Sequence, residues 1–141
     1  MKCLLLVSSL LTAAVLLGAA AESASVTYAD HDKVAKGGTI ATTPDYTVSV
    51  LKRTAAGQVE VHEKETDIFH IMEGEATFVT GGTMVGGKVS RPNQLLGTDI
   101  QGGETHHLTK GDVIVIPAGM PHWFKEVPQS IQYFMVKSIK P

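Results

Sequence analysis

The sequence predicts an all-β fold, a sandwich or barrel of short antiparallel strands in one domain. From residue 46 onward, about eight short segments are apolar at alternate positions or throughout, which is the pattern of strands. Glycine and proline turns separate these segments, and no segment in this part has a convincing 3.6-residue helical period. At 141 residues, the chain is long enough for one core and too short for two domains.

The first residues are typical of an export signal rather than of a folded element. Lys2 gives a positive start, residues 4–18 are mostly apolar, and residues 19–21 are three alanines that suit signal cleavage. We therefore expect residues 1–21 to be a signal peptide and the mature protein to be secreted or periplasmic. The alternatives are a retained membrane helix, which the short apolar run disfavours, and a lipoprotein, which the early position of Cys3 disfavours.

Cysteine content and charge exclude several classes of function. Cys3 is the only cysteine, so cleavage after residue 21 leaves a chain without disulfides, thiol nucleophiles or cysteine metal ligands. Any metal must then be bound by histidine and carboxylate side chains. The 12 basic and 14 acidic residues nearly balance and form no basic run. We therefore expect no nucleic-acid partner, and no membrane association after signal cleavage.

The elements follow in order along the chain. Residues 22–45 are assigned to an N-terminal arm, with a short strand at 26–28 and a helical turn at 30–36 that ends at Gly37-Gly38. Residues 46–141 are assigned to the β domain. Glu73-Gly74 is expected to form a tight turn, and the glycine-rich residues 81–103 a hairpin excursion or a long loop. The main strands are expected at residues 46–53, 59–62, 68–72, 76–80, 105–108, 112–116, 122–127 and 131–138.

Residues 111–122, GDVIVIPAGMPH, form the best-defined stretch of the chain. The apolar run at residues 113–116 predicts a strand that is covered on both faces. Pro117, Gly119 and Pro121 then leave few conformations for the turn that follows. The turn is therefore expected to place His122 at a well-defined position.

The spacing of this stretch resembles the second motif of the cupin family. That motif runs Gly, five residues, Pro, one residue, Gly, two residues and His, and ends after three more residues in Asn. Gly111, Pro117, Gly119 and His122 match it, whereas Glu126 stands at the position of the Asn.

The first cupin motif is also matched in spacing. It runs His, one residue, His, three or four residues, an acidic residue, six residues and Gly, and the corresponding positions here are Glu60, His62, Asp67 and Gly74. Glutamate thus replaces the first histidine, and aspartate replaces the usual glutamate. Two motifs in the right order imply a single cupin jelly-roll β-barrel, which agrees with the strand pattern.

The resemblance implies a metal site inside the barrel. In cupins, three histidines and the acidic residue typically bind one divalent metal. Carried over by position, the implied ligands are Glu60, His62, Asp67 and His122. Glu60 and His62 are two residues apart on a strand and so share one face. This donor set suits Mn, Fe, Zn or Ni, and the glutamate favours harder ions. The alternative is a hydrogen-bonded polar network without a metal.

His106 is the candidate catalytic residue. His106 and His107 are neighbours on an expected strand, so only one of them can face the interior. His106 shares its face with the apolar Leu108 and is therefore expected to point inward, as a general base or as the ligand that replaces the missing histidine at Glu60. A half-buried strand histidine without a role is the alternative. His70 is expected to point outward.

The sequence thus predicts an exported cupin-domain protein that binds a divalent metal in its barrel and acts on a small polar molecule. Nothing in the chain selects a reaction. The alternative is a non-enzymatic module that binds a small molecule, a sugar or an organic acid, without a metal. A homodimer is also expected, because cupins often pair through sheet edges.

Overall fold

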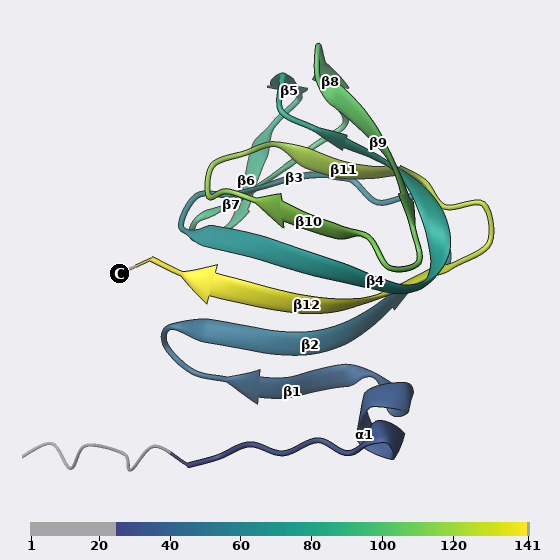
Figure 1. The fold of residues 1–141 in the computed structure, drawn as a ribbon. Coiled ribbons are helices and arrows are strands. Elements are labelled where there is room, and N and C mark those ends of the chain that lie inside the picture. Colours follow the sequence, from purple (N-terminus) through teal and green to yellow (C-terminus); the bar gives the residue numbers. More distant parts are fainter. Residues whose placement is uncertain (1–24, 141) are drawn as a thin grey trace, which may run out of the picture.

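The computed structural model describes residues 25–140. The predicted signal peptide, residues 1–21, lies outside this range. Within it, the chain forms a short helix and a succession of antiparallel strands (Figure 1). The elements are α1 (His31–Lys36), β1 (Gly38–Thr42), β2 (Tyr46–Arg53), β3 (Val59–His62), β4 (Glu65–Thr80), β5 (Thr83–Val85), β6 (Lys88–Arg91), β7 (Gln94–Gly97), β8 (Asp99–Gln101), β9 (Glu104–Thr109), β10 (Val113–Ile116), β11 (His122–Glu126) and β12 (Ile131–Ile139).

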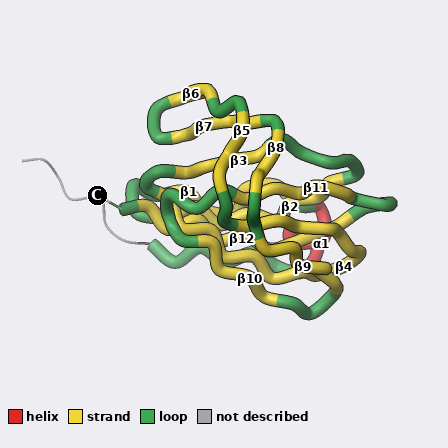
Figure 2. Tube along the Cα trace, turned by 90° about the horizontal axis from the view of Figure 1, so that it is seen from above, coloured by secondary structure: helices red, strands yellow, loops and turns green. Residues whose placement is uncertain are grey.

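The strands wrap into two facing layers, shown in Figure 1 and from above in Figure 2. One layer has the order β1, β2, β12, β4 and β10, and every neighbouring pair is antiparallel. The other has the order β9, β4, β11, β3, β7 and β6. β5 and β8 form a small separate sheet at the top of Figure 1. The predicted all-β jelly-roll fold is confirmed.

β4 belongs to both layers and corrects one prediction. It is a single strand of 16 residues, which pairs with β10 and β12 through its first part and with β9 and β11 through its second. Gly74 lies between the two parts with φ of 78°, and a Cβ there would lie 1.9 Å from the carbonyl oxygen of Ser130. The predicted tight turn at Glu73-Gly74 is therefore wrong. The glycine bends a continuous strand from one sheet into the other instead of reversing the chain.

Three further predictions can be compared with the structure. The helical turn is confirmed as α1, whose N-cap Asp30 accepts a hydrogen bond from the backbone of Lys33. No strand forms at residues 26–28. β10 is not covered on both faces, because Val113 and Val115 are 63% and 56% exposed. Alternate β10 residues pack inward, and the outward valines have no second layer over them among the described residues.

The core lies between the two layers and contains a cluster of four aromatic rings among aliphatic side chains. Phe78 meets Phe124 edge to face with ring centroids 4.6 Å apart, and Phe69 lies 4.8 Å from Tyr133. The ring of His122 lies 6.1 Å from that of Phe78, so a buried polar group adjoins this aromatic cluster. The interior therefore has an apolar part and a polar part.

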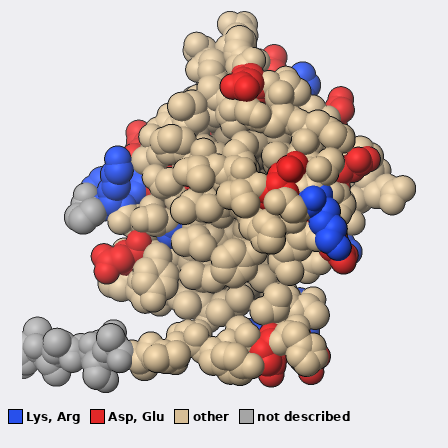
Figure 3. All heavy atoms as spheres, in the orientation of Figure 1, with Lys and Arg blue, Asp and Glu red and all other residues tan. Residues whose placement is uncertain are grey.

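The surface carries charges of both signs. On the face shown in Figure 3, Lys, Arg, Asp and Glu side chains lie mostly around the periphery, and uncharged atoms cover the centre. Among residues 25–140, no helix is long and apolar enough to span a membrane.

Candidate metal centre

Three strands bring the four predicted metal ligands together. Glu60 and His62 extend from one face of β3, and His122, the first residue of β11, pairs directly with Glu60 across the sheet. Asp67 comes from the first part of β4 in the opposite layer. The four side chains therefore meet in the space between the two layers.

The turn that contains Pro117, Gly119 and Pro121 precedes β11 and is held by backbone hydrogen bonds to two other parts of the chain. The backbone N–H of Gly119 donates to the carbonyl of His62 at 2.8 Å, and Pro121 accepts from the N–H of Gly81 at 2.9 Å. Gly119 has φ of 81°, a conformation that favours glycine. These two hydrogen bonds hold the turn against the end of β3 and the residue that follows β4. They thereby fix the position of His122.

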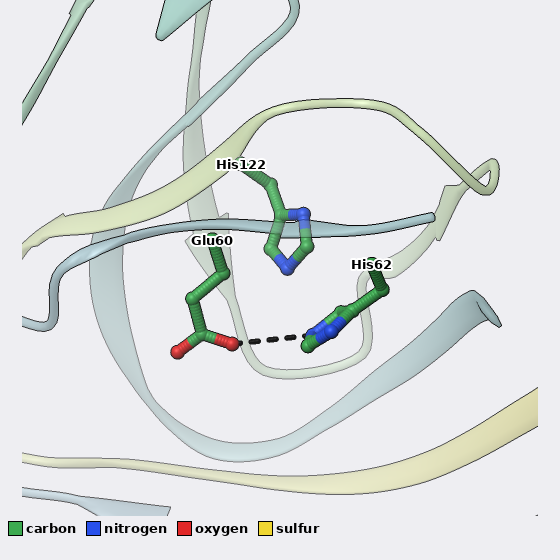
Figure 4. A group of neighbouring side chains, drawn as sticks. All are labelled: Glu60, His62 and His122. Atoms are coloured by element: carbon green, nitrogen blue, oxygen red, sulfur yellow. Dashed lines mark ion pairs between the residues drawn. The ribbon is translucent and has the colours of Figure 1, made fainter. Parts of the chain in front are cut away.

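The donor atoms of Glu60, His62 and His122 converge on one region (Figure 4). His62 Nε2 lies 3.2 Å from Glu60 Oε2 and 3.5 Å from Asp67 Oδ2. His122 Nε2 lies 3.6 Å from the same Asp67 oxygen. One donor atom from each of Glu60, His62 and His122 lies within 4.8 Å of the others. The structure therefore brings Glu60, His62 and His122 into one group, and Asp67 lies beside the two histidines without belonging to that group.

A hydrogen bond from outside the cluster orients the imidazole of His122. His122 Nδ1 lies 3.0 Å from the carbonyl oxygen of Met120, which can only accept, so Nδ1 donates and Nε2 keeps its lone pair. His62 Nδ1 lies 3.3 Å from a carboxylate oxygen of Glu65 but makes no hydrogen bond there. His122 Nε2 consequently faces the cluster in the form that binds a metal.

The electrostatics favour the metal-binding forms of these groups. Burial alone would raise the pKa of Glu60, but the hydrogen bond with His62 and the nearby His122 and Arg53 outweigh it and lower the pKa to about 2. Burial lowers the pKa of His122, and the smaller effects of the Met120 carbonyl and Asp67 do not reverse this. At neutral pH, Glu60 is therefore ionised and His122 is neutral.

Lys137 is a charged residue of the site that sequence reasoning missed. It pairs with Asp67 across β12 and β4, and its Nζ lies 2.8 Å from Asp67 Oδ1 and 2.9 Å from Glu65 Oε2. Lys137 thus neutralises one oxygen of Asp67 and leaves Oδ2 directed at the imidazoles. Lys137 is at alternate positions with Tyr133 and Met135 on β12, so the three side chains share one face of the strand. This spacing could have predicted that Lys137 faces inward.

Arg53 is the second residue that was missed. Its Nη2 donates to Glu60 Oε1 and its Nε donates to Tyr133 Oη, both at 3.3 Å. The guanidinium carbon lies 4.8 Å from the centroid of the Phe124 ring, which is a cation–π contact. Arg53 shares the inward parity of Leu51 on β2, but an arginine at a strand end is ordinarily assigned to solvent.

A cavity opens beside the four donors. It has a volume of about 210 Å³ and combines polar groups with apolar walls. Ligand pockets for drug-sized molecules are larger, at roughly 300–1,000 Å³. The cavity therefore suits a small molecule. Its lining residues are Leu51, Arg53, Gln58, Glu60, His62, Asp67, Phe69, Arg91, Gln94, His122, Phe124, Tyr133, Met135 and Lys137.

His106, the candidate catalytic residue, does not line the cavity beside the four predicted ligands. It is partly buried, as its parity predicted, and its Nε2 lies 2.8 Å from Thr80 Oγ1. It lines a different cavity, beside Met120, and the two cavities share no lining residue. The structure therefore does not bring His106 together with the predicted metal ligands. His70 is exposed on the outer face of β4, as expected.

The donor set fits a divalent ion. Atoms that bind a metal at about 2.1 Å in tetrahedral or octahedral geometry lie roughly 3.0–3.4 Å from one another. Three of the separations between Nε2 and carboxylate oxygens are 3.2, 3.5 and 3.6 Å, close to these values. The shorter side chain of Asp67 still reaches the imidazoles, because β4 carries it from the opposite layer.

Comparisons with known proteins show the family and the fold of the chain. The chain matches the family described as Cupin over residues 23–141. No curated protein matches it.

Several solved structures have a similar fold. BH2720 from Bacillus halodurans is 12% identical with a TM-score of 0.58, and the alignment covers 84% of this chain and 86% of that one. TT1209 from Thermus thermophilus is 17% identical with a TM-score of 0.53, and the alignment covers 82% of this chain and 100% of that one. The Cnp3 cupin domain of Schizosaccharomyces pombe is 13% identical with a TM-score of 0.53, covering 74% of this chain and 60% of that one.

These identities are low, so the structural matches show a shared fold alone. The family match spans most of the sequence, and both cupin motifs lie within it. The chain therefore belongs to the cupin family.

Proposed function

We propose that this chain binds one divalent metal through Glu60, His62, Asp67 and His122 and acts there on a small polar molecule. The observation that supports this most is the convergence of buried donors: Nε2 of His62 and Nε2 of His122 lie 3.5 and 3.6 Å from Asp67 Oδ2, and Glu60, His62 and His122 each offer a donor atom within 4.8 Å of the others. Imidazole nitrogens and carboxylate oxygens gathered in this way are the donors that a divalent ion needs.

The donors also favour a class of ion. Two imidazoles and two carboxylates form a harder set than three imidazoles and one carboxylate, which favours Mn or Fe(II) over Zn or Ni. When bound, such an ion polarises a substrate oxygen or activates water or dioxygen. The protein supplies ionised Glu60, neutral His122 and a partly apolar cavity that limits the water around the substrate.

Metal analysis of the purified protein tests the proposal. Protein prepared without chelator or affinity metal, and then supplemented with Mn or Fe(II), should contain about one equivalent of metal per chain, and His122→Ala should lose it. The control is His107→Ala, whose side chain is 64% exposed and contacts only Glu75 among the ion pairs. Less than about a tenth of an equivalent in the unmodified protein after supplementation contradicts metal binding.

The alternative function is a binding module that needs no metal. One observation favours it: Glu60 already pairs with Arg53, and Asp67 with Lys137, so the carboxylates have cationic partners without an ion. The two functions separate after treatment with a chelator. A binding module keeps its affinity for a small ligand, whereas a metal-dependent protein loses it.

We also propose that the mature chain begins at Glu22, is secreted or periplasmic, and forms a homodimer. The first residues have the composition of a signal peptide. Intact mass of the exported protein measures the cleavage site, and a product that retains residues 1–21 contradicts it. Sedimentation at micromolar concentration measures the assembly, and a monomeric mass contradicts the dimer.

A further inference from the structure

We propose that the cavity binds a small carboxylate and that Arg53 anchors the carboxylate group. The inference rests on the proposed function, because it assigns a ligand class to the same site. The charges, the geometry of Arg53 and the size of the cavity carry it.

The charges around the cavity favour an anion. The lining residues include three cations, Arg53, Arg91 and Lys137, and two carboxylates, Glu60 and Asp67, which gives a net charge of +1 with neutral imidazoles. If Glu65, which contacts Lys137 and Arg91, is counted as well, the sum of the side chains is 0. A bound divalent ion raises it to +2, so the positive excess comes with the metal. A negatively charged ligand neutralises this excess, and a neutral one does not.

Arg53 has N–H donors that its two side-chain hydrogen bonds do not use. Its two contacts, to Glu60 and Tyr133, are both 3.3 Å long, beyond the roughly 2.7–3.2 Å of strong N–H···O bonds. Guanidinium has five N–H donors in a planar fork that matches a carboxylate. The Phe124 ring and the Tyr133 hydroxyl hold this fork in place, and its side chain keeps 30% exposure beside the cavity. Arg53 is therefore positioned to accept a second carboxylate.

The other two cations are less suited to this role. Lys137 is only 13% exposed and is already held by two carboxylates at 2.8 and 2.9 Å. Arg91 lies at the end of β6 with half of its side chain exposed and at 3.7 Å from Glu65. Arg53 alone combines fixed orientation, access to the cavity and contact with the donor cluster.

The position of Arg53 connects the anchor to the metal site. Glu60 spans the two, with Oε1 at 3.3 Å from Arg53 Nη2 and Oε2 at 3.2 Å from His62 Nε2. A ligand whose carboxylate contacts Arg53 thus places its neighbouring atoms beside the metal-binding donors. Leu51, Phe69 and Met135 supply apolar walls for the rest of the ligand, and about 210 Å³ leaves room for only a few carbon atoms.

Calorimetric titration of the metal-loaded protein tests the inference. The probes are lactate, its neutral isostere lactamide, and inorganic phosphate. Lactate should bind more tightly than the other two. Arg53→Gln should weaken lactate binding about 10- to 100-fold, the usual effect of losing a charge-assisted hydrogen bond. Tyr133→Phe, which removes only the hydroxyl that holds Arg53, should weaken it less.

Lys52→Gln is the matched control, because Lys52 is the exposed neighbour of Arg53 on β2. It should leave lactate affinity unchanged. Equal affinity of Arg53→Gln and the unmodified protein overturns the role of Arg53, and tighter binding of phosphate or lactamide overturns the carboxylate class. Circular dichroism of each variant verifies folding, and Tyr133→Phe provides the test if Arg53→Gln is unfolded.

Metal content measured on the same samples separates the two proposals. Metal-loaded protein that binds no lactate contradicts the carboxylate inference and leaves the metal site intact. Protein that takes up no metal but binds lactate through Arg53 contradicts the metal-dependent function and supports the anchor.

Discussion

Lys137→Met tests the buried charge pair that supports the metal site. Methionine is close to lysine in length but cannot neutralise a carboxylate. The substitution leaves Asp67, which is 2% exposed, without the ammonium group 2.8 Å from its Oδ1. Removal of one partner from a buried ion pair costs about 3–5 kcal/mol in the free energy of unfolding. Because Lys137 keeps 13% exposure, we expect a value near the lower end, about 3 kcal/mol.

Urea unfolding in the presence of a chelator measures this loss. With a slope of about 1.5–2 kcal/mol per molar urea, 3 kcal/mol lowers the midpoint by about 1.5–2 M. Lys110→Met, at an exposed position, should move the midpoint little. In the double variant with Asp67→Asn, the combined loss should be smaller than the sum of the single losses, because both changes remove the same interaction.

Two results would refute this reasoning. One is a midpoint shift below about 0.5 M for Lys137→Met, which would mean that water replaces the ammonium group at little cost. The other is additivity in the double variant, which would mean that Asp67 and Lys137 do not interact in solution.

Three further predictions concern other parts of the chain. Gly74→Ala should destabilise far more than Gly111→Ala, because both glycines have positive φ but only at Gly74 would a Cβ collide with Ser130; equal losses in thermal unfolding contradict this. In metal-free protein, the pKa of Glu60 is about 2 when folded and about 4.5 when unfolded, so its stabilisation is present above pH 4.5 and is lost as the pH falls toward 2. Glu60→Gln should therefore show a flatter stability profile in acid, and an unchanged slope would falsify the assignment. His106→Ala should leave the metal content unchanged, because its side chain lines a different cavity; loss of the metal in this variant contradicts the placement.

Sequence reasoning could predict the residues that the motifs fix. The resemblance to the two cupin motifs implied Glu60, His62 and His122, and strand parity and a turn restricted by proline and glycine agreed with it. Asp67 was placed by its motif, and the structure brings it beside both histidines. The metal itself remains a proposal.

Other features depended on long-range pairing and could not be predicted locally. Glu73-Gly74 has turn chemistry, but the same glycine allows a continuous strand to bend where it passes Ser130. The outward residues of β10 are as apolar as buried ones, so composition could not reveal their exposure. Lys137 and Arg53 were missed because charged residues are rarely buried unless paired, and their partners come from other strands.

Because β4 belongs to both sheets, it also determines which backbone amides are exposed by local unfolding and which only by global unfolding. Its amides are engaged by four different strands, so none of its central hydrogen bonds can break without separating most of the fold. Backbone amides along β4 should therefore exchange with deuterium only through global unfolding, whereas those of the β5–β8 sheet exchange through local opening. Since Asp67 lies on β4, a ligand bound to that carboxylate slows exchange across the whole domain rather than at the site alone.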